Sequence, residues 1–132
     1  MLLGETQPRA YERLVQTKPR VLTAMETARV KPLPEAETKQ LVDRWAEAHG
    51  GQSAGSMLTP ETRREAWLLA EQYLGDRAAP GNVLSLIELT HQRCSATERE
   101  GAVKLGMDDL ITTLGQMTGL PPTVLDLSLI HI

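Results

Sequence analysis

The sequence contains no phenylalanine, and its tryptophans and tyrosines make up only 3% of 132 residues. A core without Phe has to be built from Leu, Val, Ala and Met, a composition that favours helices packed on helices. The sequence also has only one cysteine, Cys94, so no disulfide can form within the chain. A single cysteine is typical of a protein in a reducing compartment, and we expect a cytoplasmic protein.

Long apolar runs are missing as well. None approaches the roughly 20 residues that cross a bilayer, and no basic segment followed by an apolar stretch opens the chain. We therefore expect no membrane partner. The formal net charge is −3, from 14 basic and 17 acidic residues, which argues against a nucleic-acid partner recruited by overall charge. Basic residues are frequent before Leu33. They could form a basic edge that faces phosphate, but a helix face exposed to solvent is the simpler interpretation.

Self-contained catalytic chemistry is absent too. No Gly-rich loop is followed by Lys, so the chain by itself has no cradle for a triphosphate. His49, His91 and His131 are far apart in the sequence, with no Cys or carboxylate at metal-ligand spacing around them. The pair Asp108-Asp109 is typical of a helix start. We conclude that these residues do not form a complete enzyme.

The first 33 residues are predicted to contain both short helices and short strands. Residues 8–16 predict a helix, because Pro8 suits its start and Tyr11, Leu14 and Val15 share one face. A second short helix is expected at residues 21–25. Residues 1–3 and 28–30 are interpreted as short strands.

The remaining chain is predicted to be a run of amphipathic helices. We expect four main helices, at residues 35–49, from 60 to the stop at Gly75, at 80–92 and at 108–117. Thr59 and Pro60 are the strongest helix start in the chain, as a capping hydroxyl followed by a residue without an N–H. A polar loop is expected at residues 50–57 and a charged break at 95–100. The helices should share one core, which includes Trp45, Trp67, Leu69, Leu84 and Ile87.

An ordered set of motifs resembles one protein family. Residues 4–11 read Gly-Glu-Thr-Gln-Pro-Arg-Ala-Tyr, and residues 58–61 read Leu-Thr-Pro-Glu. These are followed by Tyr73, Asp76-Arg77, Pro80, Leu86-Ile87-Glu88 and, at residues 118–121, Thr-Gly-Leu-Pro. In this order and spacing they resemble the second half of the first ATPase module of Clp-type AAA+ unfoldases, the family of ClpA and ClpB. The short stretch between Thr90 and Asp108 leaves no room for an inserted coiled domain, and in this the chain looks more like the ClpA branch.

The resemblance implies a fold and a division of the chain. The fold would be mainly α, with a short α/β remnant of the AAA+ large subdomain at residues 1–33 and the helical AAA+ lid at 34–118. Residues 119–126 would begin the linker to a second module. The resemblance also implies a parent protein that forms a homo-oligomeric, hexameric ring, hydrolyses ATP with Mg²⁺ and remodels protein substrates as a chaperone or unfoldase.

Four residues occupy nucleotide-facing positions by the same resemblance. Thr6 and Gln7 fall where the family has the polar sensor that orients the attacking water. Pro80 and Asn82 fall where the lid approaches the nucleotide, although Asn82 replaces a Lys and loses its charge. The largest departure is at Thr23 and Ala24, where the family has arginines that reach the neighbouring subunit's phosphate.

Two other interpretations stay open. A non-catalytic AAA+-like scaffold would explain the missing arginines, and an unrelated helical interaction domain would require residues 1–33 to be helical or disordered. The ends of the sequence are also unusual. Met1 falls inside the family's central sheet, so we expect it to be an internal Met or a misassigned start. Residues 127–132, Leu-Ser-Leu-Ile-His-Ile, match one reading frame of a transposon-end adapter used in sequencing libraries. We expect them to be an artefact that does not contribute to stability.

Overall fold

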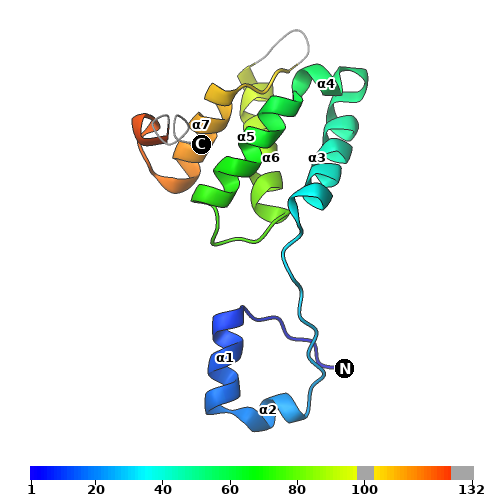
Figure 1. Ribbon diagram of the computed structural model, residues 1–132, viewed down its shortest axis with the longest axis vertical. Coiled ribbons are helices and arrows are strands. Elements are labelled where there is room, and N and C mark those ends of the chain that lie inside the picture. The colour runs from blue at the N-terminus through cyan, green and yellow to red at the C-terminus, as the bar shows by residue number, and fades with distance from the viewer. Residues whose placement is uncertain (98–102, 126–132) are drawn as a thin grey trace. The chain divides into compact units, whose positions relative to one another are not determined.

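The computed structural model describes residues 1–97 and 103–125, and the described part is mainly helical (Figure 1). It divides into two compact units, Met1–Lys31 and Pro32–Ile132, where the sequence suggested a boundary between residues 33 and 34. The predicted tail at residues 127–132 lies outside the described residues. No helix in the described residues combines the length and apolar character of a membrane span.

The first unit consists of α1 (Pro8–Thr17) and α2 (Pro19–Thr23), each with Pro in its first turn. The helix predicted at residues 8–16 is confirmed, and the second helix begins and ends two residues earlier than the predicted 21–25. The two predicted strands, at residues 1–3 and 28–30, are not observed, and both segments lack regular secondary structure. A strand needs a partner for its backbone N–H and C=O groups, and the described residues supply none. No side chain of this unit is buried, and Tyr11, Leu14 and Leu22 are only half-buried.

The second unit is a helical bundle with one core. Its main helices are α3 (Glu35–Gly50), α5 (Pro60–Tyr73), α6 (Gly81–Thr97) and α7 (Met107–Thr118). α6 packs against both α5 and α7, and α5 also contacts α3 and α7. Leu69 and Ile87 are fully buried, and Trp45, Trp67 and Leu84 pack against the same core. The four predicted helices and their shared core are confirmed.

The helix ends follow local chemistry. The Thr59 hydroxyl accepts a hydrogen bond from the Thr62 N–H at 3.2 Å, which caps α5 as predicted. Gly51 adopts φ +55 at the end of α3, and Gly119 adopts φ +76 at the end of α7. Both conformations favour glycine. α6 does not stop at Gln92 but continues to Thr97, so the break predicted from residue 95 is wrong for its first three residues.

The loop predicted at residues 50–57 is also wrong. The segment forms a 3-10 turn, η1 (Gly51–Ser53), and the short helix α4 (Ala54–Met57). Its Gly and Ser content suggested irregular structure, but Ala54 and Met57 are both buried, so packing stabilises a helical turn. The Leu105 N–H donates to the Met57 carbonyl at 2.8 Å and ties this turn to the segment before α7.

The segment predicted to begin a linker, residues 119–126, is described as far as residue 125, and it contributes Leu125 to the same core. Residues 122–125 form a helical turn after Pro121, and Leu125 is fully buried. The Leu125 methyl group lies 4.0 Å from the position of a Cβ on Gly115, so α7 and this turn approach closely. The helical unit therefore extends through Leu125.

Leu86 and Leu89 on α6 provide a test of the helix orientation. Leu86 is fully buried and Leu89 is 43% exposed. Leu86→Ala should lower the free energy of unfolding by about 2–5 kcal/mol, because it leaves a cavity between the helices. Leu89→Ala should cost less than about 1 kcal/mol, since its side chain is partly in water already. Urea unfolding of both variants measures the difference, and equal losses would contradict this orientation of α6.

Candidate functional site

The start of α6 is the best-defined part of the predicted nucleotide-facing region. The Leu33 N–H donates to the Ala79 carbonyl at 3.0 Å and fixes this turn against the beginning of the unit. The Ala79–Pro80 peptide bond is cis. Asn82 is 1% exposed, and its side-chain oxygen accepts a hydrogen bond from the Val83 N–H at 2.8 Å. Its amide is therefore directed to the helix start, while Pro80 is half-buried.

A crevice of about 180 Å³ lies beside this turn, between α3, α5 and α6. Three basic side chains and one acidic side chain are among its lining residues, which are Glu35, Thr38, Lys39, Val42, Pro60, Arg63, Arg64, Trp67 and Val83. This lining suits a small anionic group resting on an apolar floor. The volume is below the roughly 300 Å³ of pockets that enclose a whole ligand, so the crevice would hold only part of a nucleotide-sized molecule.

The charges around the crevice are unequally neutralised. Arg63 forms an ion pair with Asp43 on α3 and donates to the Leu58 carbonyl at 3.0 Å, so its guanidinium is held in place. Within residues 1–97 and 103–125, Lys39 and Arg64 have no acidic partner in ion-pair contact. The Thr38 hydroxyl is buried and has no hydrogen-bond partner there. Two cations and one unused hydroxyl thus line or adjoin the space.

Thr6 and Gln7 belong to the other unit. Both are exposed, and the Thr6 hydroxyl makes only a long contact, 3.5 Å, with the Gln7 carbonyl. Gln7 is the residue before α1, and its side chain makes no capping hydrogen bond. Their polar tips are therefore not committed to the fold. The structure brings Pro80 and Asn82 together at one helix start and leaves Thr6 and Gln7 in a separate unit.

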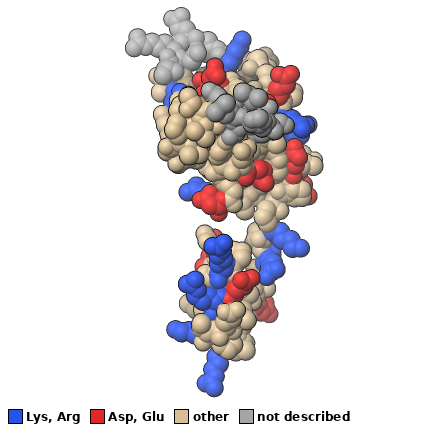
Figure 2. Space-filling view, turned by 60° about the vertical axis from the view of Figure 1, so that its left-hand side comes forward, with Lys and Arg blue, Asp and Glu red and all other residues tan. Residues whose placement is uncertain are grey.

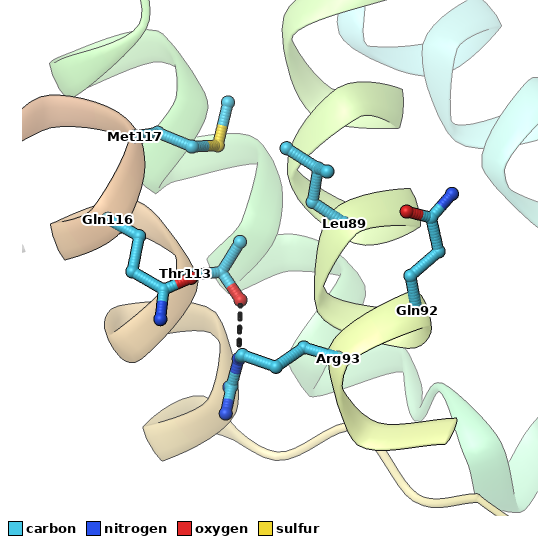
Figure 3. Close-up of a pocket in the computed structure, with 6 residues that line it drawn as sticks. All are labelled: Leu89, Gln92, Arg93, Thr113, Gln116 and Met117. Atoms are coloured by element: carbon cyan, nitrogen blue, oxygen red, sulfur yellow. Dashed lines mark hydrogen bonds between the residues drawn. The ribbon is translucent and has the colours of Figure 1, made fainter. Parts of the chain in front are cut away.

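A larger, open hollow of about 450 Å³ lies between α6 and α7 (Figure 3). Leu89 and Met117 lie toward one end, and Arg93 crosses from α6 to α7 at the other. The Arg93 guanidinium donates to the Thr113 hydroxyl at 3.4 Å and to the Asp109 carbonyl at 2.8 Å. No local pattern in the sequence singles out Arg93 or Thr113.

Beneath this hollow, two threonines join the helices. The Thr90 hydroxyl lies 2.9 Å from the Thr113 hydroxyl and 2.7 Å from the Leu86 carbonyl. Both threonines are buried, at 0% and 2% exposure. Their hydroxyls satisfy one another and nearby carbonyls, as buried polar groups require. These hydrogen bonds form a polar seam between α6 and α7, and the seam fixes the register of the two helices.

The histidines are arranged differently from what their sequence separation suggested. The rings of His49 on α3 and His91 on α6 lie 5.5 Å apart by their centroids, and both contact Trp45. Within the described residues, no group of three or more His, Cys, Asp or Glu is placed to hold a metal ion. His131 lies outside the described residues. We identify the Trp45–His49–His91 group as a ring cluster that the sequence did not reveal.

The contribution of the buried Thr113 hydroxyl to stability can be measured by comparison with the exposed hydroxyl of Thr112. Thr113→Val should lower the free energy of unfolding by about 1–3 kcal/mol, because Arg93 and Thr90 each lose a buried partner. Thr112→Val is the matched control on the same helix, since Thr112 is exposed, and it should change stability by about 0.5 kcal/mol or less. Chemical denaturation measures both. Equal small effects would show that the seam does not depend on this hydroxyl.

Comparison with known proteins adds no relative. No protein-family model, curated protein or solved structure matches the chain.

Proposed function

We propose that the chain is the sensor and lid part of a Clp-type AAA+ module, within a cytoplasmic ring-forming ATPase that remodels or unfolds proteins. The single observation that carries the proposal is the contrast between the two units. A helical bundle with its own core follows a segment that buries none of its side chains. Such a segment needs further polypeptide to cover it, as the last part of an AAA+ large subdomain would.

The first unit has the surface expected of a piece of a larger domain. Met1, Leu2, Leu3 and Val30 are 82% exposed or more. Tyr11, Leu14 and Val15 share one face of α1 and cover no core within their own unit. An apolar helix face and unpaired extended segments are what remain when the partner strands of a sheet are absent. In the proposal, residues 1–3 and 28–30 are strands of the complete subdomain.

The crevice beside the start of α6 supports a nucleotide-facing role for the lid. Lys39 and Arg64 lack acidic partners among the described residues and line a space next to Val83, which follows Asn82. Positive charge in a partly apolar crevice favours an anionic, partly aromatic ligand. ATP with Mg²⁺ in the parent protein has this chemistry. The described residues hold only one side of such a site.

The position of the missing arginines suggests a slow ATPase. Thr23 is the last residue of α2 and donates its hydroxyl to the Arg20 carbonyl at 2.8 Å, and Ala24 follows it. Both are exposed, so an arginine at either position would not have to be buried. Neither side chain carries the charge that stabilises a transferring phosphoryl group. We therefore propose that this module serves mainly in nucleotide-dependent assembly of a homo-oligomeric ring.

One observation favours a different function. The first unit has two helices and no strand among its described residues, and an unrelated helical interaction domain would have the same appearance. The coding sequence upstream of Met1 distinguishes the two functions. A Gly-rich loop followed by Lys, and then an acidic strand end, supports the AAA+ module. A region without them supports the interaction domain.

The chain by itself should not bind ATP with micromolar affinity. The groups that hold the β- and γ-phosphates and the metal are not in its sequence, so Lys39 and Arg64 are expected to give only weak, salt-sensitive binding. Isothermal titration calorimetry with MgATP measures this directly. Tight binding that survives physiological salt would show that these residues contain a complete nucleotide site.

In the full-length protein, Thr23→Arg and Ala24→Arg should raise ATP turnover. An arginine finger is worth about 10³–10⁵ in rate, and the assembled ring should gain part of that factor. Turnover per ring measures the effect, with Arg20→Ala as the control variant from the same helix. If the unmodified protein already turns over fast and Arg20→Ala abolishes it, then Arg20 is the finger. If the added arginines change nothing, the scaffold function holds.

A further inference from the structure

The ring cluster joins two helices through side chains that can change their charge near neutral pH. Trp45 and His49 lie one turn apart on α3, stacked with centroids 4.3 Å apart and an interplanar angle of 21°. His91 comes from α6 and meets both rings edge-on, at 5.3 Å from Trp45 and 5.5 Å from His49. These three contacts fasten the C-terminal half of α3 to α6.

The backbone contact of His49 determines which of its ring nitrogens carries a hydrogen. Its Nδ1 lies 2.8 Å from the Trp45 carbonyl, and a carbonyl can only accept, so Nδ1 carries the hydrogen. This bond orients the ring over Trp45. His49 is exposed and His91 is half-buried, so protons from solvent reach the cluster while water does not fully screen the two rings from one another.

We infer that the Trp45–His49–His91 cluster is an acid-sensitive clamp. With neutral imidazoles it holds α3 against α6, and protonation of His91 beside His49 loosens that contact. A charged His91 would be partly desolvated against Trp45 and would face a second imidazole at 5.5 Å. Two imidazolium ions at that distance repel one another.

Among the described residues, Arg93 and Arg63 have acidic partners of their own. Burial, and secondarily the charge of His49, lowers the pKa of His91 from its usual 6.5. The nearby cation on α6, Arg93, is directed to α7, where it pairs with Asp109. Arg63 on α5 pairs with Asp43 on α3. His49 is thus the ionisable group whose charge acts on His91.

Because the pKa of His91 is lowered in the folded chain, the stability of the fold decreases as the pH falls. The unfolded chain binds a proton on His91 more readily than the folded chain does, so folding becomes less favourable as the pH falls. The loss begins near 6.5 and is complete once the pH is below the lowered pKa of the folded state. Each unit of separation between the two pKa values is about tenfold in the folding equilibrium constant.

The clamp and the proposed ligand-binding crevice share helix α3. α3 carries Trp45 and His49 near its C-terminal end, and near its start it carries Glu35, Thr38 and Lys39 of the crevice. A change in how α3 sits on α6 alters both ends of the same helix. The inference itself does not depend on the proposed function, because the clamp is defined by the ring contacts alone.

The test compares the full chain with His91→Gln and His49→Gln at about pH 7.5 and about pH 5.5, a range in which ordinary histidines titrate and carboxylates stay charged. Urea midpoints measure stability, and hydrogen exchange of α3 amides, corrected for the intrinsic rate, measures the local contact. The unmodified chain should lose stability at the lower pH, and α3 should lose more protection than α7. His91→Gln should abolish this pH dependence, and His49→Gln should reduce it.

Gln92→His is the matched control. It places a histidine at an exposed position of α6, outside the ring cluster, and should leave the pH dependence as in the unmodified chain. If His91→Gln retains the full pH dependence, or if α3 and α7 lose protection equally, the clamp is overturned. If His91→Gln is too unstable to compare, the reduced pH dependence of His49→Gln and the exchange of α3 amides in the unmodified chain decide the question.

Discussion

Burial of α6 between α5 and α7 is the contact on which the rest of the helical unit depends. Leu86 and Ile87 are fully buried in the middle of this helix, and Val83 and Cys94 extend the buried surface along it. A helix with so much apolar surface is stable only when neighbours cover it, because isolated helices of this length are marginal in water. α5 and α7 supply that cover, and α3 completes it through Trp45 and the α3–α5 contact.

Polar groups set the register of this packing. Thr90 faces Thr113 across the α6–α7 seam, and Arg93 donates to the Asp109 carbonyl in the first turn of α7. A buried hydroxyl pair contributes little net stability but leaves an unsatisfied group if the helices slide. The same logic applies at Asn82, whose side chain is bound to the first turn of α6. The core holds the helices together, and these hydrogen bonds select one alignment.

The two units differ in how far their own residues can stabilise them. The helical unit has a continuous core from Val42 to Leu125, while the first unit buries none of its described side chains. The space-filling view shows Lys and Arg spread over the surface of both units (Figure 2). In the first unit this charge accompanies exposed apolar residues such as Val15, Val21 and Met25. The two units therefore differ in how much of their apolar surface their own residues cover.

The sequence alone determined the main helices, because their signals are local. Thr59 and Pro60 mark the start of α5, Gly51 and Gly119 lie at the ends of α3 and α7, and apolar spacing places Leu69 and Ile87 inside. Tertiary packing decided the rest. Burial of Ala54 and Met57 turned an expected loop into a helix, and residues 1–3 and 28–30, which were predicted to be strands, find no strand partner among the described residues. The crevice around Lys39 and Arg64 and the cluster of Trp45, His49 and His91 depend on residues far apart in the chain. No local pattern specifies which helix faces meet, and for that reason only the folded structure shows these sites.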